Sequence, residues 1–342
     1  MDKIRLGRTE LLVSRSGFGA IPIQRISDND AVYLLRKAYD NGINFYDTAR
    51  AYTDSEIKIG QAFSHVREKV ILATKSGCTD PQKIILDLET SLRNLKTDYI
   101  DIFQFHNPKS LQDVTIENGV YEVIAKARDE GKIRFVGFTN HRLPVALDAL
   151  HSGLFETIQF PFNQLSSENE IKFAAECKEK DVGFIAMKAL SGGLITNAST
   201  SCAFLRQFDN VVPIWGIQHE WELDEILSFE TQTPILNETM WALINKDRKE
   251  LTGSFCRGCG YCLPCPAQIP IPTAARISLL LNRTVFENFL EDDFKKQMAL
   301  INNCTDCGHC KKHCPYELNT PQLLKNNLMA YEKFYLEKKA GK

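Results

Sequence analysis

An α/β fold, a (β/α)8 barrel of parallel strands followed by a small helical domain, is the architecture that the sequence predicts. From about residue 15 to 230, short runs rich in Val, Ile and Phe alternate with segments whose apolar residues recur at helical spacing. This alternation stops after about residue 236. Eight of the eleven cysteines then fall between residues 256 and 314. We therefore expect two domains, at residues 1–236 and 237–330.

Eight apolar runs are the predicted strands of the barrel. They cover residues 16–20, 42–49, 70–76, 99–107, 133–140, 157–163, 183–190 and 211–217. Between them lie predicted helices such as residues 28–42, which end on a glycine, and residues 81–95, which start on Pro81. Eight strands that alternate with helices predict a closed barrel of the TIM type. A doubly wound sheet is the alternative, but it usually has fewer strands and a glycine-rich turn after the first one.

Segments at both ends of the predicted barrel have other roles. Residues 4–19 predict a hairpin that plugs the bottom of the barrel, ahead of the first parallel strand. Residues 237–253 predict a helical bridge to the cysteine-rich region.

Composition excludes some classes of protein. The net charge of -2 over 342 residues argues against nucleic acid as a primary partner, because a phosphate-binding surface needs an excess of Lys and Arg. No run of apolar residues is long enough for a membrane-spanning helix, and residues 1–10 do not resemble a signal peptide. We therefore expect a cytoplasmic protein with no membrane partner. In a reducing cytoplasm, clustered cysteines are more often metal ligands than disulfides.

Polar side chains stand where the predicted strands end. In a barrel of this kind, the chemistry is carried by residues at the carboxyl ends of the strands and in the loops that follow. Taken singly, each has a structural explanation, such as a helix cap or a surface lysine. Together they form a candidate site. In chain order they are Asp47, Tyr52, Lys75, His106, Thr139, Asn140 and Gln159.

The sequences around these residues resemble the aldo-keto reductase superfamily. Residues 44–56 are similar to that family's Asp and Tyr segment, residues 70–77 to its lysine strand, and residues 99–108 to its histidine strand. Residues 131–140 are similar to its nicotinamide clamp. The resemblance covers residue 3 to about residue 230 in the expected order. It implies an oxidoreductase that uses NAD(P)H and acts on a small carbonyl or alcohol.

The resemblance also implies catalytic roles. Reduction of a carbonyl by hydride leaves an alkoxide that must be protonated, and Tyr52 would be the acid. Lowering a tyrosine pKa by about 3 units takes roughly 4 kcal/mol. The Lys75 ammonium would supply this free energy by stabilising the phenolate, and Asp47 would keep that lysine charged. His106 would donate to the substrate oxygen. The nicotinamide amide would be hydrogen-bonded by Thr139, Asn140 and Gln159.

Two positions depart from the family pattern. Met187 lies where the family usually has an aromatic residue that stacks on the nicotinamide, so a thioether would pack there instead. Glu222 lies near the place of an arginine that clamps a 2′-phosphate, and an anion there repels a second anion. The expected dinucleotide is therefore NADH rather than NADPH. Glycines in residues 190–197 would let the backbone approach a pyrophosphate.

The cysteines form two runs, and a proline follows each. The second run has the spacing C-x2-C-x2-C-x3-C-P of bacterial ferredoxins, in which the fourth cysteine binds the other cluster. Its members are Cys304, Cys307, Cys310 and Cys314. The first run shortens the last gap to two residues. Its members are Cys256, Cys259, Cys262 and Cys265.

The ferredoxin pattern predicts two 4Fe-4S clusters with crossed ligands. One would be held by Cys256, Cys259, Cys262 and Cys314, and the other by Cys265, Cys304, Cys307 and Cys310. Zinc is the alternative metal, because it also accepts four thiolates. Residues 270–302 between the runs predict two helices, which indicates a helical ferredoxin-like module.

The whole chain thus resembles an iron-sulfur branch of the aldo-keto reductases. Clusters carry single electrons and a nicotinamide carries a hydride, so we expect a link between carbonyl reduction, or alcohol oxidation, and a partner such as ferredoxin or flavodoxin. Three alternatives stay open. The clusters feed a substrate in the barrel without a stably bound dinucleotide, the barrel is the scaffold of an electron-transfer subunit, or the clusters are structural.

Overall fold

The computed structural model describes residues 1–251, 255–283 and 286–340, and the chain divides into two compact units. The barrel unit consists of Met1–Ala189 and Ala198–Ile244. The cysteine-rich unit consists of Leu190–Asn197 and Asn245–Lys342. The second unit therefore includes eight residues, Leu190–Asn197, that interrupt the barrel unit after its seventh strand.

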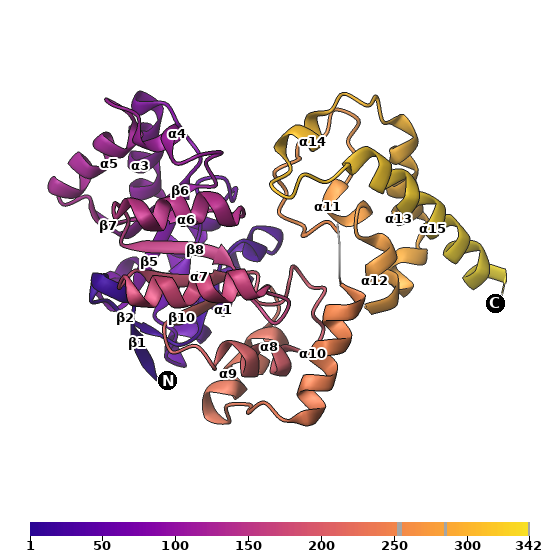
Figure 1. The fold of residues 1–342 in the computed structure, drawn as a ribbon, viewed down its shortest axis with the longest axis horizontal. Coiled ribbons are helices and arrows are strands. Elements are labelled where there is room, and N and C mark those ends of the chain that lie inside the picture. Colours follow the sequence, from indigo (N-terminus) through magenta and orange to yellow (C-terminus); the bar gives the residue numbers. More distant parts are fainter. Residues whose placement is uncertain (252–254, 284–285, 341–342) are drawn as a thin grey trace. The chain divides into compact units, whose positions relative to one another are not determined.

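Eight parallel strands form the closed barrel that the sequence predicts (Figure 1). Neighbouring strands pair in sequence order, and the last strand closes the barrel against the first. The strands are β3 (Gly17–Gly19), β4 (Phe45–Asp47), β5 (Ile71–Ser76), β6 (Ile100–His106), β7 (Ile133–Thr139), β8 (Thr157–Pro161), β9 (Gly183–Met187) and β10 (Val211–Gly216). All eight predicted runs contain one of them, because strands covered on both faces are nearly continuous apolar runs.

Helices connect successive strands, and local capping signals determine where several of them begin. Ser27 accepts a hydrogen bond from the backbone of Asp30 at the start of the first helix, and Asp80 caps the third ahead of Pro81. The helices of the barrel unit are α1 (Asp28–Asp40), α2 (Ser55–Phe63), α3 (Pro81–Leu95), α4 (Gln112–Thr115), α5 (Val120–Asp129), α6 (Leu143–Ser152), α7 (Glu168–Glu179), α8 (Ala198–Leu205) and α9 (Glu220–Thr231).

An antiparallel hairpin of β1 (Lys3–Arg5) and β2 (Leu12–Ser14) precedes the barrel. Its apolar side chains pack with inward-facing strand residues in one buried group that includes Leu6, Leu11, Val13, Phe45, Ile71, Ile102, Ile185 and Val212. Gly7 sits at φ +52°, where an added Cβ would lie 2.2 Å from the backbone nitrogen of Gly183. The hairpin is thus the predicted plug at the amino ends of the strands.

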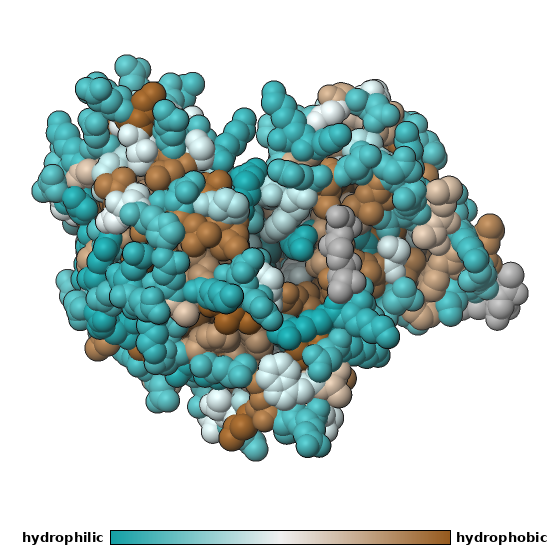
Figure 2. Space-filling view, viewed as in Figure 1, coloured by the Kyte–Doolittle hydropathy of each residue, from teal (hydrophilic) through white to brown (hydrophobic). Residues whose placement is uncertain are grey.

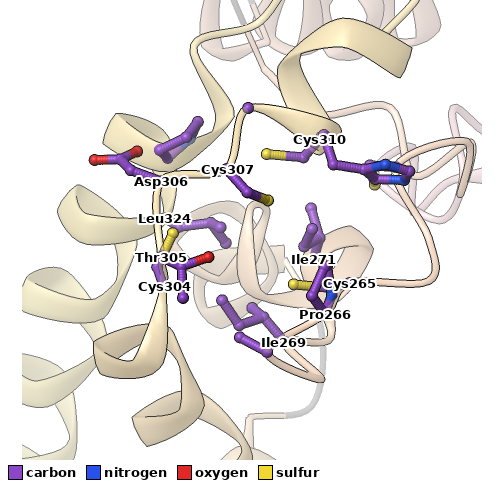
Figure 3. Close-up of a pocket in the computed structure, with 15 residues that line it drawn as sticks. Cys265, Pro266, Ile269, Ile271, Cys304, Thr305, Asp306, Cys307, Cys310 and Leu324 are labelled. Atoms are coloured by element: carbon purple, nitrogen blue, oxygen red, sulfur yellow. The ribbon is translucent and has the colours of Figure 1, made fainter.

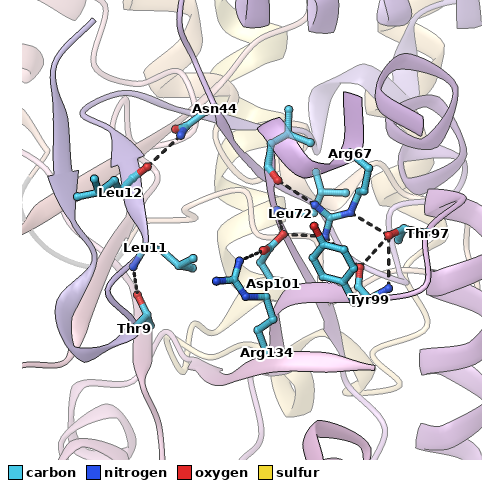
Figure 4. A network of polar contacts seen from close by, with 11 residues as sticks. Thr9, Leu11, Leu12, Asn44, Arg67, Leu72, Thr97, Tyr99, Asp101 and Arg134 are labelled. Carbon is cyan, nitrogen blue, oxygen red and sulfur yellow. Dashed lines mark hydrogen bonds and ion pairs between the residues drawn. The ribbon is translucent and has the colours of Figure 1, made fainter. Parts of the chain in front are cut away.

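A buried ion-pair network stabilises the same end of the barrel (Figure 4). Asp101, near the start of β6, is 1% exposed and accepts hydrogen bonds from Arg67 Nη2 and Arg134 Nη1, each at 2.7 Å. The backbone N–H of Leu72 donates to the same carboxylate at 2.9 Å. Because residues at the amino ends of barrel strands serve stability rather than chemistry, we assign this network a structural role.

Helices and loops make up the described part of the cysteine-rich unit. Its helices are α11 (Ile271–Ala274), α12 (Ile277–Arg283), α13 (Asp292–Ala299), α14 (His309–His313) and α15 (Thr320–Ala340), and α10 (Glu238–Glu250) leads into it from the barrel unit. Its core includes Ile277, Met298, Ile301, Leu324 and Tyr331 together with Cys256, Cys262 and Cys310. The helical module that the sequence predicts is therefore present, and three of its cysteines belong to its core.

The described helices are all too short or too polar to cross a lipid bilayer. Hydrophilic side chains predominate on the face drawn in Figure 2, and the apolar ones lie in scattered patches.

Candidate active site and cysteine sites

A buried ion pair joins the carboxyl ends of two neighbouring strands. Asp47 is the last residue of β4, and Lys75 lies on β5 beside it. Lys75 Nζ donates to Asp47 Oδ1 at 2.5 Å and to the carbonyl oxygen of Thr48 at 2.6 Å. The two side chains are 1% and 3% exposed. A buried charge needs such a partner, so Asp47 fixes the position of Lys75 in the barrel interior.

Two side-chain amides saturate the other oxygen of the same carboxylate. Gln159 Nε2 on β8 donates to Asp47 Oδ2 at 2.9 Å, and Gln104 Nε2 on β6 donates to it at 3.0 Å. Gln104 did not figure among the predicted site residues. Its position two residues before His106 on the same strand was the available signal, because alternate residues of a strand share a face.

Tyr52 and His106 lie beside this ion pair. Tyr52 follows β4 in a short loop, and its ring lies edge-on to the His106 ring, with centroids 6.0 Å apart and planes at 85°. Lys75 Nζ is 5.2 Å from the centroid of the Tyr52 ring. Both rings keep partial solvent exposure, which a residue that touches a substrate requires. The structure therefore brings all four predicted catalytic residues together.

The electrostatic environment differs from the expectation for the tyrosine. Burial, with a smaller contribution from Asp47, raises the pKa of Tyr52 rather than lowering it. Burial also lowers the pKa of Lys75, against the opposing effect of Asp47. Burial and the Lys75 charge lower the pKa of His106 to about 3. Tyr52 is therefore a neutral phenol and His106 a neutral imidazole near pH 7, so both have a hydrogen to donate.

The residues of the predicted nicotinamide clamp form hydrogen bonds with other residues of the chain. Thr139 Oγ1 donates to Gln159 Oε1 at 3.2 Å, so the side chains of Thr139 and Gln159 meet next to Asp47. Asn140 instead ties two loops together, because its Nδ2 donates to the carbonyl of Pro108 at 2.8 Å and its Oδ1 accepts from the backbone of Arg142 at 2.9 Å. Gln159 Oε1 retains a second lone pair for a ligand amide.

Met187 ends β9, where it is partly exposed and lies in register with Pro161 of β8. The glycine segment that follows three residues later belongs to the cysteine-rich unit. There the carbonyl of Gly192 accepts from Arg276 Nη1 at 2.6 Å, and that of Leu194 accepts from Arg283 Nη1 at 2.9 Å. Arg276 and Arg283, each more than 80 residues later in the chain, thus hydrogen-bond to the glycine segment for which the sequence predicted pyrophosphate binding.

Glu222 folds back onto the start of its own helix. Its Oε2 accepts from the backbone N–H of Gln218 at 2.8 Å and of His219 at 2.9 Å, which makes a capping box at the N-terminus of α9. The N-terminus of a helix attracts anions, and here the carboxylate of the chain itself fills that position.

The eight clustered cysteines gather around two cavities in the cysteine-rich unit. The first cavity is lined by Cys256, Cys259, Cys262 and Cys314. The second is lined by Cys265, Cys304, Cys307 and Cys310 (Figure 3), and Cys262 lines both cavities. Each cavity thus combines cysteines of both runs.

The donors in these cavities fit iron-sulfur clusters. Each cavity is lined by at least four cysteines, and 4Fe-4S clusters are held by four cysteine thiolates. Burial, with smaller effects of Cys259 and Cys256, raises the pKa of Cys262 to about 12. Ionisation of such thiols requires positive charge in the cavity, which iron supplies.

Comparisons with known proteins match the barrel region and the cysteine-rich region to two different families. The aldo/keto reductase family model matches residues 16–224, and that of a 4Fe-4S dicluster domain matches residues 255–319. L-galactose dehydrogenase of Arabidopsis thaliana is 31% identical over 220 residues, which are 57% of this chain and 68% of the relative. The NADH-specific methylglyoxal reductase of Escherichia coli is 27% identical over 230 residues, 58% of this chain and 71% of the relative.

A solved structure shows the same fold for the barrel unit. The holo form of an aldo-keto reductase from Bacillus halodurans superposes with a TM-score of 0.64 at 22% sequence identity, covering 72% of this chain and 96% of that one. The barrel, the polar residues at its strand ends and the family match lead to one conclusion: the chain belongs to the aldo/keto reductase family and carries a 4Fe-4S dicluster domain after its barrel.

Proposed function

We propose that the protein interconverts a small carbonyl compound and its alcohol by hydride transfer with NAD(P)H, and that two 4Fe-4S clusters link this reaction to one-electron transfer. Reduction that depends on NAD(P)H is general for the family. The observation that carries the proposal is the assembly of Asp47, Lys75, Tyr52 and His106 at the carboxyl ends of the barrel strands.

The four side chains suit protonation of an alkoxide. A nicotinamide, when bound, would supply the hydride for the carbonyl carbon. Tyr52, a neutral phenol, gives its proton to the carbonyl oxygen as negative charge develops there. Lys75 Nζ lies 5.2 Å from the centroid of the Tyr52 ring, so its positive charge would stabilise the resulting phenolate. Neutral His106 donates its N–H to the same oxygen and fixes its direction.

The residues at the ends of β7, β8 and β9 would hold the nicotinamide. Thr139 and Gln159 lie together and present an amide oxygen with a free lone pair, which suits the carboxamide of the ring. Met187 would pack on the ring face, and Asn140 would keep the intervening loop in place.

Glu222 favours NADH over NADPH in this proposal. A 2′-phosphate at the N-terminus of α9 would compete with the Glu222 carboxylate for the N–H groups of Gln218 and His219, and the two anions would repel each other. The NADH-specific relative from Escherichia coli is compatible with this choice.

Two clusters would match the electron count of a hydride. One hydride corresponds to two electrons, and two clusters hold one electron each. The grouping of the cysteines around two cavities supports this arrangement. Ferredoxin or flavodoxin would be the external one-electron partner, and the clusters would connect it to the barrel.

A second function is favoured by the Leu190–Asn197 segment. Because the backbone N–H groups of Gly193 and Ile195 both donate to the carbonyl of Leu190, fewer donors of this segment remain for a pyrophosphate than the sequence suggested. In that case the clusters would feed a substrate in the barrel directly, without a stably bound dinucleotide. The barrel would serve as the scaffold of an electron-transfer subunit if neither a dinucleotide nor a substrate reached Tyr52.

The test is an anaerobic titration of the cluster-loaded protein with NADH and with NADPH. Dinucleotide binding is followed by fluorescence and cluster reduction by visible absorbance. We expect NADH to bind at submillimolar concentration and more tightly than NADPH. Absence of binding by either dinucleotide would contradict the hydride mechanism and favour the cluster-fed alternative.

A further inference from the structure

The two cysteine cavities differ in the charged side chains that surround them. Arg257 lines the cavity of Cys256, Cys259, Cys262 and Cys314. Its guanidinium carbon lies 4.4 Å from the centroid of the Phe255 ring and 4.5 Å from that of the Tyr316 ring. These cation–π contacts hold the positive charge in place beside the cysteines.

A second arginine packs on the loop between Cys256 and Cys259. An added Cβ at Gly258 would lie 2.8 Å from the guanidinium carbon of Arg276, so glycine allows this close approach. Arg276 Nε donates to the carbonyl of Pro272 at 2.7 Å, and Nη1 donates to that of Gly192 at 2.6 Å. These contacts hold the positive charge of Arg276 beside this loop.

The cavity of Cys265, Cys304, Cys307 and Cys310 has a different environment. The residues that line it include His309 and Asp306, and the Asp306 carboxylate lies 3.6 Å from Lys325 Nζ. Both partners of this pair are more than half exposed, and Cys307 is exposed as well. Water therefore screens the charges near this cavity more than those of the first one.

We propose that Arg257 and Arg276 give the cluster held by Cys256, Cys259, Cys262 and Cys314 the higher reduction potential of the pair, so that the first electron added to the protein rests there. This inference rests on the proposed function in requiring two loaded clusters. Reduction of a 4Fe-4S cluster adds one electron and neither makes nor breaks a bond to the protein. The added negative charge is stabilised by fixed cations, and net charge is one of the determinants of cluster potential.

Solvent acts in the opposite direction, because water also stabilises the more negative reduced cluster and reaches Cys307. The two arginine charges should raise the cluster potential more than water does, since charges in a partly buried setting interact more strongly than screened ones. Arg276 joins the loop of Cys256 and Cys259 to Gly192, in the segment that follows β9.

The test is a potentiometric titration of the anaerobic, cluster-loaded full-length protein, reduced with dithionite and followed by electron paramagnetic resonance. Two one-electron transitions are expected. The Cys307→Ser variant identifies the transition of the second cavity, because substitution of that exposed ligand changes the signal of its own cluster. In the wild-type protein, the transition that Cys307→Ser leaves unchanged should occur at the higher potential.

Arg257→Gln and Arg276→Gln should each lower the potential of the first cluster, with at least a tenfold change in its reduction equilibrium, about 59 mV for one electron. The second cluster should keep its potential. Arg257→Lys retains the charge and should retain the potential. Lys333→Gln on the exposed face of α15 is the matched control and should change neither transition.

The outcomes separate the inference from the proposed function. Two clusters with the opposite order of potentials, or arginine variants without a shift, would overturn the inference and leave the proposed function intact. If an arginine variant does not take up its clusters, the order of the two reduction potentials in the wild-type protein and the potentials of Arg257→Lys still test the inference. Fewer than two clusters by iron and sulfide analysis would refute the two-cluster function, and this inference with it.

Discussion

Gln104 Nε2 donates to Oδ2 of Asp47 at 3.0 Å, and Oδ2 is the carboxylate oxygen that the hydrogen bond from Lys75 leaves available. Gln104 is fully buried, and its Oε1 has no hydrogen-bond partner among the described residues. A buried acceptor without a partner destabilises a protein by about 1–3 kcal/mol. The amide is therefore placed for Asp47 at the expense of stability.

Replacing Gln104 by leucine should separate activity from stability. Gln104→Leu removes one of the two amide donors on Asp47, so Asp47 and Lys75 are held less firmly and kcat should fall roughly tenfold. The free energy of unfolding should stay the same or rise, because the unpaired Oε1 is removed. Steady-state reduction of a small aldehyde and chemical denaturation measure the two quantities.

Thr157→Val is the matched control for this experiment. Thr157 is fully buried on β8, its Oγ1 also lacks a hydrogen-bond partner in the described part of the chain, and its side chain does not contact Asp47 in the observed network. This variant should change stability in the same direction and leave kcat unchanged. Equal kcat for Gln104→Leu and wild type would show that Gln159 alone positions Asp47.

Tyr52→Phe tests the proton donor. It removes the phenol O–H and keeps the ring that packs against His106, so kcat/KM for carbonyl reduction should fall about 100- to 10,000-fold with little change in thermal stability. Tyr121→Phe is the control, since the Tyr121 hydroxyl donates to the carbonyl of Leu154 and lies outside the proposed site. Full turnover by Tyr52→Phe would rule out this tyrosine as the acid.

The pKa of His106 predicts a particular dependence on pH. In the folded protein it is lowered to about 3 from its ordinary value of 6.5, mainly by burial. The unfolded chain therefore binds the proton first as the pH falls, and His106 makes the folded state progressively less stable from pH 6.5 to about 3. Above pH 6.5 it has no such effect.

Two measurements check this behaviour. The rate of carbonyl reduction should show no ionisation of His106 between pH 5 and 8, because the imidazole stays neutral in that range. Denaturant unfolding at several pH values should give a shallower loss of stability below pH 6.5 for His106→Asn than for wild type. An activity transition near pH 6.5 that disappears in His106→Asn would contradict the assignment.

The sequence predicted the barrel and the positions of its polar strand ends well, because both depend on short-range patterns. The strand that ends at Asp47 and the strand that contains Lys75 are apolar runs, so a charged residue at either place stands out. Cysteine spacing is equally local, and the exchange of Cys265 and Cys314 between two clusters stays a prediction; in the structure Cys314 lines the cavity of Cys256, and Cys265 lines that of Cys304.

Features that depend on tertiary contacts could not be predicted in this way. The pKa of Tyr52 depends on how deeply the fold buries the residue: burial and Asp47 raise this pKa, whereas the sequence suggested that the Lys75 charge lowers it. The hydrogen bond from Arg276 to the carbonyl of Gly192 joins residues 84 positions apart in the chain, so no local pattern could predict it. Gln104 precedes His106 by two residues on β6, but its hydrogen bond to Asp47 depends on the tertiary fold.

Glu222→Ala should change the preference between the two dinucleotides. The substitution removes the carboxylate from the N-terminus of α9 and frees the N–H groups of Gln218 and His219 for another anion. We expect the ratio of NADPH to NADH affinity to rise about tenfold in fluorescence titrations, with loss of the helix cap lowering stability by about 1 kcal/mol. Glu225→Ala, one turn further along the exposed face of α9, is the control and should leave the ratio unchanged. If Glu222→Ala binds both dinucleotides as the wild type does, the 2′-phosphate does not reach α9 and Glu222 serves only as a cap.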